Sequence, residues 1–455
     1  MKHMDIDLKN KRVLVLGLGD TGLSVLRWLS GQGATLSVAD SRDTPPSLAL
    51  VQVDMPQVTV YLGAFQERAF AGAELIVISP GVALSEPQVQ AAIARGIPVV
   101  GDIELFALFR PKKPKLIAIT GSNGKSTVTT MVGAMCQRAG LKTIVAGNIG
   151  VPVLDTLSME TPDVYVLELS SFQLETTSSL NADAATVLNV SEDHLDRYGG
   201  IAEYATAKAR IFKGSGVQVL NRRNSWSRQM ALPERHIVYF GDDGPDAAHN
   251  YGLRLTGRDI WLMQGDTDLL NFAECRIAGL HNATNALAAL ALCRAIGLNR
   301  APLLAALREF KGLPHRVEWV TEINGITFFD DSKGTNVGAT CAAIAGLPPK
   351  VVLIAGGDGK GQNFDPLQQH IQRNARGVVL IGRDAPIIAA AIKAANVPMI
   401  SADSMQEAVQ KAFSAAHPGD AVLLSPACAS FDMFRNYVHR AEVFVDAVRH
   451  LEATI

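Results

Sequence analysis

Cysteine is scarce in this sequence and follows no metal-binding or disulfide pattern. The 455 residues include 5 cysteines, an odd number, and none of them has C-x-x-C spacing to another. Disulfide frameworks and structural zinc sites both need regularly spaced cysteines. We therefore expect neither of them, and a reducing cytosol suits the chain.

Long hydrophobic runs and an excess of one charge are also missing. No uncharged apolar run reaches the ~18 residues of a membrane span. The beginning, MKHMDIDLKNKR, has no apolar core of the kind found in secretory signals. The formal net charge of -2 creates no field that would attract nucleic acid or an anionic membrane. We expect a cytoplasmic protein with no membrane span and no nucleic-acid partner.

Short β-branched segments alternate with longer helical patterns along most of the chain. The segments that read as buried strands are Val13–Leu16, Ile117–Thr120, Val164–Leu167, Val352–Ile354 and Val422–Leu424. Each is followed by glycine, serine or a polar capping residue and then by a helical stretch, which is typical of βαβ units. The sequence therefore predicts an α/β fold built on parallel sheets.

Two breaks divide this α/β pattern. Arg110–Pro114 is basic and interrupted by proline just before a new strand, and Gly312–Pro314 closes a long helical region. Linkers of this composition commonly separate domains. We predict three domains, with the limits 1–110, 111–312 and 313–455.

The first glycine-rich loop is Gly17–Gly22, with the spacing G-x-G-x-x-G. It follows a predicted strand and opens a helix, and Asp40 ends the next strand. Taken alone, this fingerprint predicts an NAD-dependent oxidoreductase. Backbone N–H groups at a helix start hold any nucleotide diphosphate equally well, UDP included. A tight turn without a ligand is the third interpretation.

The second glycine-rich loop lies between another predicted strand and helix. It consists of Gly121, Ser122, Asn123, Gly124, Lys125, Ser126 and Thr127. It matches the phosphate-facing half of a P-loop, although Ile119 stands where the full pattern has glycine. Its N–H groups would surround phosphates, Lys125 would contact the β and γ oxygens, and Ser126 or Thr127 would reach Mg²⁺. ATP here and a nucleotide-carrying substrate at the first loop explain both motifs, unless the second is a chance turn.

Further blocks resemble the Mur ligases and the folylpolyglutamate synthases, in the same order along essentially the whole chain. They are Leu167–Gln173, Asn189–Asp196, His281–Ala286, Leu313–Arg316, Asp330–Asn336 and Ser425–Asp432. The last two resemble the Mur ligases that add D-glutamate to UDP-N-acetylmuramoyl-L-alanine. The resemblance implies a Rossmann-like N-terminal domain for the UDP-substrate, a P-loop-type central ATPase domain and a Rossmann-like C-terminal domain. It also implies a monomeric ligase of peptidoglycan precursor synthesis that uses ATP and Mg²⁺ and forms an acyl phosphate.

The same resemblance assigns catalytic roles beside Lys125. Glu168 would bind Mg²⁺ together with Ser126, although a helix-capping carboxylate is the other interpretation of its position. His194 would bind a second metal, whereas a lone histidine is more often structural. Lys208 matches a lysine that the family carries as a carbamate, an anionic oxygen ligand near Mg²⁺, and on sequence alone it is a solvated helix lysine.

Three binding sets follow from the resemblance. The ATP set, beside the second loop, is Asn282, Asn285, Arg316 and Asp331. The D-glutamate set is Lys333, Thr335, Lys360, Ser430 and Tyr437. The UDP-substrate set is Asp20, Thr21, Asp40, Ser41, Arg42, Gly81 and Asn148. Two of these residues depart from the family pattern, since Tyr437 replaces a frequent phenylalanine and Asp20 replaces an apolar residue.

Three other functions compete with this hypothesis. A sister ligase would add a different amino acid, but Asp331–Thr335 and Ser425–Ser430 favour D-glutamate. An NAD-dependent oxidoreductase would leave the second loop unexplained and lacks evident hydride-transfer residues. A non-catalytic nucleotide-binding protein would have no need of Lys125, Glu168 and His194.

Overall fold

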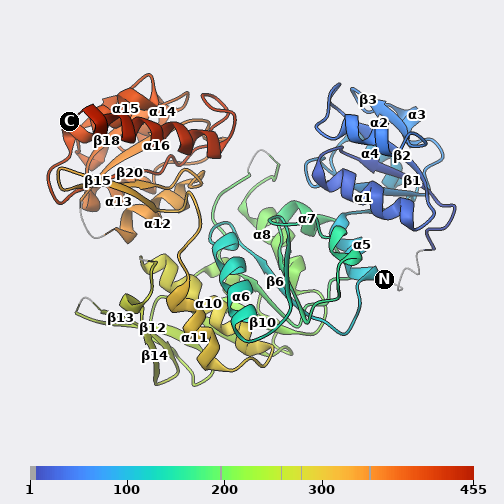
Figure 1. Ribbon diagram of the computed structural model, residues 1–455, viewed down its shortest axis with the longest axis horizontal. Coiled ribbons are helices and arrows are strands. Elements are labelled where there is room, and N and C mark those ends of the chain that lie inside the picture. The colour runs from blue at the N-terminus through green and yellow to red at the C-terminus, as the bar shows by residue number, and fades with distance from the viewer. Residues whose placement is uncertain (1–6, 195–196, 258, 278, 348–349, 455) are drawn as a thin grey trace.

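The computed structural model describes residues 7–194, 197–257, 259–277, 279–347 and 350–454. Its α/β lobes form three bodies, with the central lobe below and the N- and C-terminal lobes above it on opposite sides (Figure 1). No helix in the described ranges is long and apolar enough to cross a membrane. The first half of MKHMDIDLKNKR and two block residues, Leu195 and Asp196, lie outside the described residues.

The N-terminal lobe is a parallel sheet of order β3-β2-β1-β4-β5 with helices between its strands. Its strands are β1 (Arg12–Leu16), β2 (Thr35–Asp40), β3 (Thr59–Leu62), β4 (Leu75–Ile78) and β5 (Val99–Val100). Its helices are α1 (Asp20–Gly31), α2 (Leu48–Asp54), α3 (Glu67–Phe70), α4 (Pro87–Ala94) and α5 (Asp102–Phe109). The strand order reverses beside β1, and open α/β sheets bind their ligands at such a switch point.

The central lobe contains a parallel sheet of order β11-β10-β9-β6-β8-β7. Its strands are β6 (Lys115–Thr120), β7 (Thr143–Gly147), β8 (Val164–Glu168), β9 (Ala184–Val187), β10 (Val217–Asn221) and β11 (Ile237–Phe240). Its helices are α6 (Lys125–Arg138), α7 (Ser171–Glu175), α8 (Ile201–Ala209), α9 (Ser225–Gln229), α10 (Leu280–Ala295) and α11 (Arg300–Glu309), with 3₁₀ turns at Asp155–Ser158, Arg210–Phe212 and Phe272–Glu274. A small antiparallel sheet is formed by β12 (Tyr251–Thr256), β13 (Asp259–Gln264) and β14 (Thr267–Asn271).

The C-terminal lobe has the strand order β15-β16-β20-β17-β18-β19, and only its edge strand β15 runs antiparallel to its neighbour. Its strands are β15 (Glu318–Ile323), β16 (Ile326–Asp330), β17 (Val351–Gly356), β18 (Ala375–Ile381), β19 (Met399–Ser401) and β20 (Ala421–Leu424). Its helices are α12 (Val337–Gly346), α13 (Leu367–Asn374), α14 (Ala385–Ala391), α15 (Met405–Ala415) and α16 (Tyr437–Thr454), with a 3₁₀ turn at Lys393–Ala395.

The predicted α/β fold class is confirmed. All the strands expected from the sequence lie within β1, β6, β8, β17 and β20. Each of these strands is buried along most of its length, as continuous β-branched runs in parallel sheets should be. The domain limits 1–110, 111–312 and 313–455 stay a prediction.

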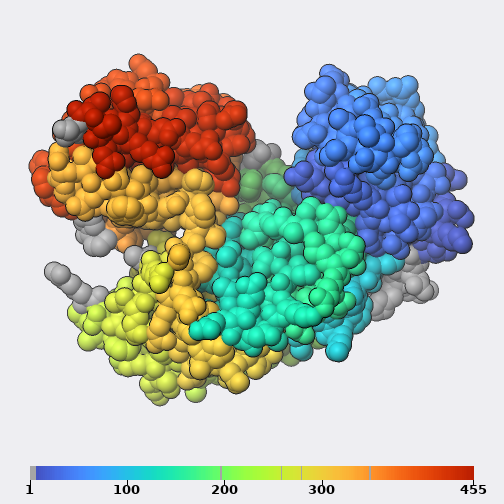
Figure 2. Space-filling model, in the orientation of Figure 1, coloured from blue at the N-terminus to red at the C-terminus, as the bar shows by residue number. Residues whose placement is uncertain are grey.

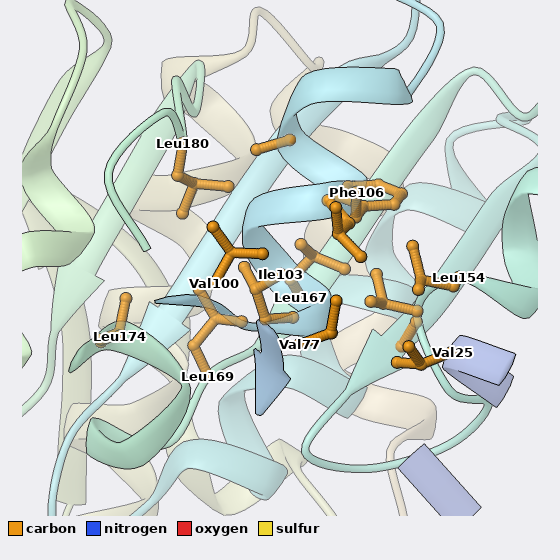
Figure 3. Close-up of a cluster of buried hydrophobic side chains, with 14 of the residues drawn as sticks. Val25, Val77, Val100, Ile103, Phe106, Leu154, Leu167, Leu169, Leu174 and Leu180 are labelled. Atoms are coloured by element: carbon orange, nitrogen blue, oxygen red, sulfur yellow. The ribbon is translucent and has the colours of Figure 1, made fainter. Parts of the chain in front are cut away.

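One buried hydrophobic cluster joins the N-terminal and central lobes. Helix α5 supplies Ile103 and Phe106, and these side chains meet Val77 of the first sheet and Leu167 of the second in the same cluster (Figure 3). The rings of Phe106 and Tyr165 pack edge to face with their centroids 5.1 Å apart. The buried residues of the C-terminal lobe form clusters of their own, which contain no residue of the other lobes.

Candidate active site

The first glycine-rich loop makes a close turn between β1 and α1. Gly17 has a φ of +90°, and a Cβ on Gly22 would lie 1.9 Å from the Gly17 carbonyl oxygen. Only glycine fits such an approach of helix to strand. The loop borders a cavity of about 580 Å³ between the N-terminal and central lobes. Every residue of the expected UDP-substrate set lines it: Asp20, Thr21, Asp40, Ser41, Arg42, Gly81 and Asn148.

Asp40 is not free to bind a ribose hydroxyl. Its carboxylate accepts hydrogen bonds from the Leu18 N–H at 2.7 Å and from Arg42 Nε and Nη2 at 2.8 and 2.7 Å. Burial would raise the pKa of Asp40, but these bonds, chiefly from the Arg42 side chain, hold it below its usual value. The pair therefore presents the guanidinium of Arg42, which is suited to phosphate oxygens, at the cavity.

The second glycine-rich loop leads directly into α6, whose N-terminus favours phosphate. Gly124 has a φ of +84°, and a Cβ there would lie 2.6 Å from Asn285 Oδ1. Lys125 Nζ donates to the carbonyl oxygens of Gly121 at 2.8 Å and Ser122 at 3.0 Å. Loss of water around the ammonium lowers the pKa of Lys125, while Glu168 and Asp193 act in the opposite direction.

A second cavity, of about 320 Å³, lies between the central and C-terminal lobes. The expected ATP residues that line it are Asn123, Gly124, Thr127, Asn282, Asn285, Arg316 and Asp331. The remaining loop residues do not line it: Gly121 and Ser122 precede α6, and Lys125 and Ser126 are its first two residues. Burial raises the pKa of Asp331 to about 7 against a hydrogen bond from Ser425, and burial lowers the pKa of Arg316.

Glu168 offers one unused carboxylate oxygen in the interior. The residue is 1% exposed, its Oε1 accepts from Asn148 Nδ2 at 2.7 Å, and its Oε2 has no hydrogen-bond partner among the described residues. The helix that follows is capped by Ser170 with Gln173, not by Glu168. A buried unpaired carboxylate oxygen beside the phosphate loop fits a hard cation such as Mg²⁺.

Lys208 is not the solvated helix lysine that its sequence suggests. It is 1% exposed, and its Nζ lies 2.9 Å from the Gly121 carbonyl oxygen, 3.5 Å from Thr120 Oγ1 and 4.4 Å from the centre of the Tyr204 ring. Burial lowers the pKa of Lys208 well below its usual value, and the neighbouring Lys125 lowers it further. Helix α8 thus directs this amine at the phosphate loop.

His194 lies at the end of the same group, in a left-handed conformation with a φ of 55°. Its ring packs against Phe172 at 4.8 Å, and its Nε2 lies 3.7 Å from Asp193 Oδ2. One region of the central lobe, at the carboxyl ends of its strands, therefore contains Lys125, Glu168, Lys208 and His194. This edge is where α/β sheets bind ligands.

The expected D-glutamate residues lie on loops of the C-terminal lobe, and none of them lines either cavity. Lys333 Nζ lies 5.1 Å from the Tyr437 ring centre, and Lys360 Nζ lies 3.7 Å from Asp193 Oδ1. Ser430 is buried and Thr335 is half-buried. The structure thus places Lys333 beside Tyr437, and it separately places Lys360 beside the central lobe.

Two residues at the lobe boundary, Asn336 and His281, had no role assigned to them from the sequence. Asn336 donates through Nδ2 to Asn123 Oδ1 at 3.0 Å and to Asp193 Oδ2 at 3.4 Å, which connects the two lobes. His281 lines the smaller cavity, and its buried Nδ1 has no hydrogen-bond partner in the part of the chain that the structure describes. Burial lowers the pKa of His281 to about 4. Both residues lie within blocks that resemble the Mur ligases, Asp330–Asn336 and His281–Ala286, and this position is the sequence feature that could have indicated a role for them.

Family models cover most of the chain. The N-terminal domain of MurD-like Mur ligases matches residues 11–101, the Mur ligase middle domain matches 119–293, and the Mur ligase glutamate ligase domain matches 315–428. Solved Mur ligases share the fold at low identity. The MurC of Thermotoga maritima, a UDP-N-acetylmuramate-alanine ligase, has a TM-score of 0.59 at 18% identity over 97% of this chain and 99% of its own. The pseudomurein peptide ligase type C of Methanothermus fervidus has a TM-score of 0.61 at 20% identity over 97% and 100%.

Curated relatives are much closer in sequence. A UDP-N-acetylmuramoylalanine–D-glutamate ligase of Methylobacillus flagellatus is 61% identical over 98% of both chains. The protein of the same name from Nitrosospira multiformis is 58% identical over 98% of this chain and 97% of its own. Identity at this level over nearly the full length leaves no large segment unmatched. The chain therefore belongs to the Mur ligase family.

Proposed function

We propose that the protein adds D-glutamate to UDP-N-acetylmuramoyl-L-alanine, with ATP converted to ADP and phosphate. One observation carries this proposal most directly. Asn148 lines the larger cavity and donates to Glu168 beside the phosphate loop, so the substrate site and the ATP site meet at one hydrogen bond of 2.7 Å. A substrate bound by its UDP group in the larger cavity can thereby present its carboxylate to the phosphates. The names of the two similar relatives, which are D-glutamate ligases, also support the proposal.

The chemistry requires an activated carboxylate. The alanine carboxylate attacks the γ-phosphorus of ATP, the bond to ADP breaks, and an acyl phosphate forms. The amine of D-glutamate then attacks the acyl carbon through a tetrahedral intermediate, loses a proton, and inorganic phosphate leaves. Lys125 and the N–H groups at the start of α6 stabilise negative charge on the transferring group, and Arg316 reaches the same loop from the other lobe.

Mg²⁺ would be held by Glu168 Oε2 and by the hydroxyl of Ser126. Both are hard oxygen donors, and the unpaired oxygen of Glu168 is the feature that fits the ion. Bound there, the ion would neutralise phosphate charge during transfer. The related MurF of Thermotoga maritima, with which this chain shares a fold, was solved in complex with ADP.

Lys208 is proposed to carry a carbamate in the active enzyme. An uncharged lysine amine can attack CO₂, releasing one proton and forming an anionic carbamate. Burial favours that uncharged form, and the amine lies 2.9 Å from the Gly121 carbonyl oxygen. A carbon-13 carbamate signal should appear in the wild-type protein supplied with labelled bicarbonate and be missing in Lys208→Arg. Full activity of Lys208→Arg would overturn this role.

Amino-acid choice is assigned to the loops of the C-terminal lobe. Lys333, Lys360 and Ser430 would hold the two carboxylates of D-glutamate and leave its amine free. Phosphate release from ATP, measured with UDP-N-acetylmuramoyl-L-alanine and each amino acid in turn, tests this assignment. D-Glutamate and Mg²⁺ should both be required. Equal release with L-lysine or meso-diaminopimelate would assign the chain to a sister ligase.

The first loop is proposed to bind UDP rather than NAD. The engagement of Asp40 by Arg42 supports this, because the fingerprint for NAD needs a carboxylate that can accept from the ribose. Calorimetric titration should show binding of the UDP-substrate, and micromolar NAD binding in competition with it would revive the oxidoreductase hypothesis. A monomer acting in the cytoplasm, where nucleotide substrates are made, completes the proposal.

A further inference from the structure

The short segment that follows Gly312–Pro314 has an uncommon backbone. His315 has a φ of 61° and Val317 a φ of 48°, so both residues on either side of Arg316 are left-handed. This region is uncommon for residues other than glycine, is tolerated better by asparagine, aspartate and histidine, and is most unfavourable for a β-branched residue such as valine. Residues held in such conformations cost about 1–3 kcal/mol each and persist only when their surroundings fix them.

Two consecutive acids at the end of β16 fix this segment from either side. Asp330 Oδ2 lies 2.6 Å from His315 Nδ1, and its Oδ1 accepts the Ser332 N–H at 2.8 Å. Asp331 lies on the other side, where the backbone N–H of Val317 acts to lower the pKa of its carboxyl group. Asp330 is 1% exposed and Asp331 is 6% exposed, so water does not compete strongly for either carboxylate.

The residue between the two held positions is Arg316, which the ATP site uses. Its side chain extends from the C-terminal lobe to the central lobe, where Nη2 lies 3.4 Å from Ser126 Oγ at the start of α6. Its Nε is buried without a hydrogen-bond partner in the described structure. A long side chain that crosses a lobe boundary is placed by its backbone, and this backbone is held in an unfavourable conformation by the acids.

On the basis of the proposed function, we infer that Asp330 is a positioning residue for phosphoryl transfer, acting through His315 to direct Arg316 at the terminal phosphate. Asp330 does not line the cavity that we propose holds ATP, whereas its neighbour Asp331 does. By binding both His315 Nδ1 and the Ser332 N–H, Asp330 joins His315 to the Ser332–Lys333 turn. The Lys333 N–H makes a second connection, since it donates to the His315 carbonyl oxygen at 3.2 Å. The direction of Arg316 and the D-glutamate loop would thus depend on one buried acid.

The test is a double-mutant cycle on turnover with the full-length protein. Asp330→Asn keeps an acceptor for the Ser332 N–H but replaces the charged bond to His315 with a weaker neutral one. His315→Phe removes that bond while keeping a ring against Tyr437, whose ring centre lies 6.2 Å from that of His315. Each should lower kcat roughly ten- to a hundredfold, as misplacement of a catalytic group does. In an Arg316→Lys background each should lower it less than about twofold, because partners in one unit are not additive.

Asp420→Asn is the matched control. Asp420 is also a buried acid of the C-terminal lobe and also pairs a side chain, Arg376, with a backbone N–H, that of His417 at 2.8 Å. It lies at the opposite end of β20 from the site, where the strand begins. Its variant should keep kcat within about twofold, because Asp420 lies away from the site and its loss affects mainly stability.

A binding measurement separates this inference from the proposed function. Calorimetry with ADP and with a non-hydrolysable ATP analogue gives the contribution of the terminal phosphate to affinity. Asp330→Asn and Arg316→Lys should both reduce the preference for the analogue. A preference unchanged in Asp330→Asn but lost in Arg316→Lys, or fully additive kcat effects, would overturn the positioning role. A wild-type protein that shows the preference but releases no phosphate with D-glutamate would overturn the proposed function alone.

Discussion

The two outer lobes are attached to the central lobe in different ways. The N-terminal lobe shares a buried apolar cluster with it, with Phe106 and Ile103 of α5 at the centre (Figure 3). The C-terminal lobe meets it through polar contacts, such as the hydrogen bond from Asn336 to Asn123, around the smaller cavity. In the space-filling view a hollow also separates the two outer lobes above the central one (Figure 2).

Because of this difference, we expect the first junction to be rigid and the second to open and close. Apolar packing is dense, so the larger cavity, where we propose that UDP binds, should keep its shape when substrates bind and leave. Polar contacts exchange with water at little net free energy, so the second junction can open to admit ATP and close to exclude water from an acyl phosphate. The first junction adds a polar clamp as well: Arg197 donates to the carbonyl oxygens of Pro80 and Val82 and to Glu175.

The largest effect is expected at Lys125 of the second glycine-rich loop, whose amine contacts the Gly121 and Ser122 carbonyl oxygens. Lys125→Ala should abolish phosphoryl transfer, with a fall in kcat of at least about 10²–10³-fold, because charge stabilisation in the transition state is lost. The fold should remain, since the lysine contacts loop carbonyls and not a hydrophobic core. Phosphate release and circular dichroism measure the two properties. Lys142→Ala, at an exposed ion pair of the same lobe, is the control and should be fully active. Near-normal turnover by folded Lys125→Ala would refute the P-loop assignment.

The next prediction contrasts stability across the two junctions. Phe106→Ala removes a fully buried ring from the shared cluster and should lower the free energy of unfolding by about 3–5 kcal/mol. Asn336→Ala removes polar contacts at the other junction and should lower it by only about 1 kcal/mol, while reducing turnover more than Phe106→Ala does in the folded fraction. Urea unfolding followed by fluorescence gives both values. Equal destabilisation by the two variants would contradict the division between the junctions.

The sequence predicted one side of this comparison better than the other. The parallel strands and both glycine-rich loops are local patterns of a few consecutive residues, and each is where the sequence placed it. The contacts at the C-terminal junction join residues far apart in the chain, such as Asn123 with Asn336, and no local pattern encodes them. The first loop predicted a nucleotide but not which one, because the bond from Arg42 to Asp40 depends on side-chain direction.

The burial of Lys208 could not be predicted from the sequence either. A lysine in an ordinary helical stretch is usually solvated, and only the packing of α8 against the phosphate loop puts its amine 2.9 Å from Gly121. The left-handed backbone at Val317 is equally invisible in the sequence, since valine is a poor residue for it. Functional sites are where local rules fail, because tertiary contacts hold residues against their preferences.

Motion should be confined to the second junction. Gly312, with a φ of +87°, and Pro314 flank the candidate hinge before Arg316. Small-angle scattering should show compaction when an ATP analogue and the UDP-substrate bind together, because closure brings the C-terminal lobe onto the nucleotide. Hydrogen exchange in α5 should stay unchanged at the same time. No compaction, or loosening of α5, would count against this hinge.

The smallest effects concern acidity, and their signs should differ between the junctions. Glu104 of α5 lies at the first junction. Burial would raise its pKa, but hydrogen bonds from the hydroxyls and N–H groups of Ser179 and Ser178 hold it below the ordinary 4.5. A lowered pKa gives stability that is present above the unfolded value and lost as pH falls through the folded one. Glu104→Gln should therefore lower the urea midpoint at pH 7, and the difference should vanish in acid.

Asp331, at the second junction, should behave in the opposite way. Burial raises its pKa to about 7, outweighing the hydrogen bond from Ser425 and the charge of Arg316. Between roughly pH 4 and 7 the folded protein therefore keeps a proton that the unfolded chain has released, so this group makes the free energy of unfolding fall as pH rises through that window. Asp331→Asn cannot titrate, so it should remove this fall in the free energy of unfolding. Measured without nucleotide, the urea midpoint of the variant should therefore rise relative to that of the wild type between pH 4 and pH 8. The difference in urea midpoint between variant and wild type should therefore change with pH in opposite directions for Glu104→Gln and Asp331→Asn. That result would show that the first junction stabilises its charged carboxylate, whereas the second destabilises its own in the absence of a ligand. Changes of the same sign would contradict the electrostatic part of the comparison and leave only the difference in packing.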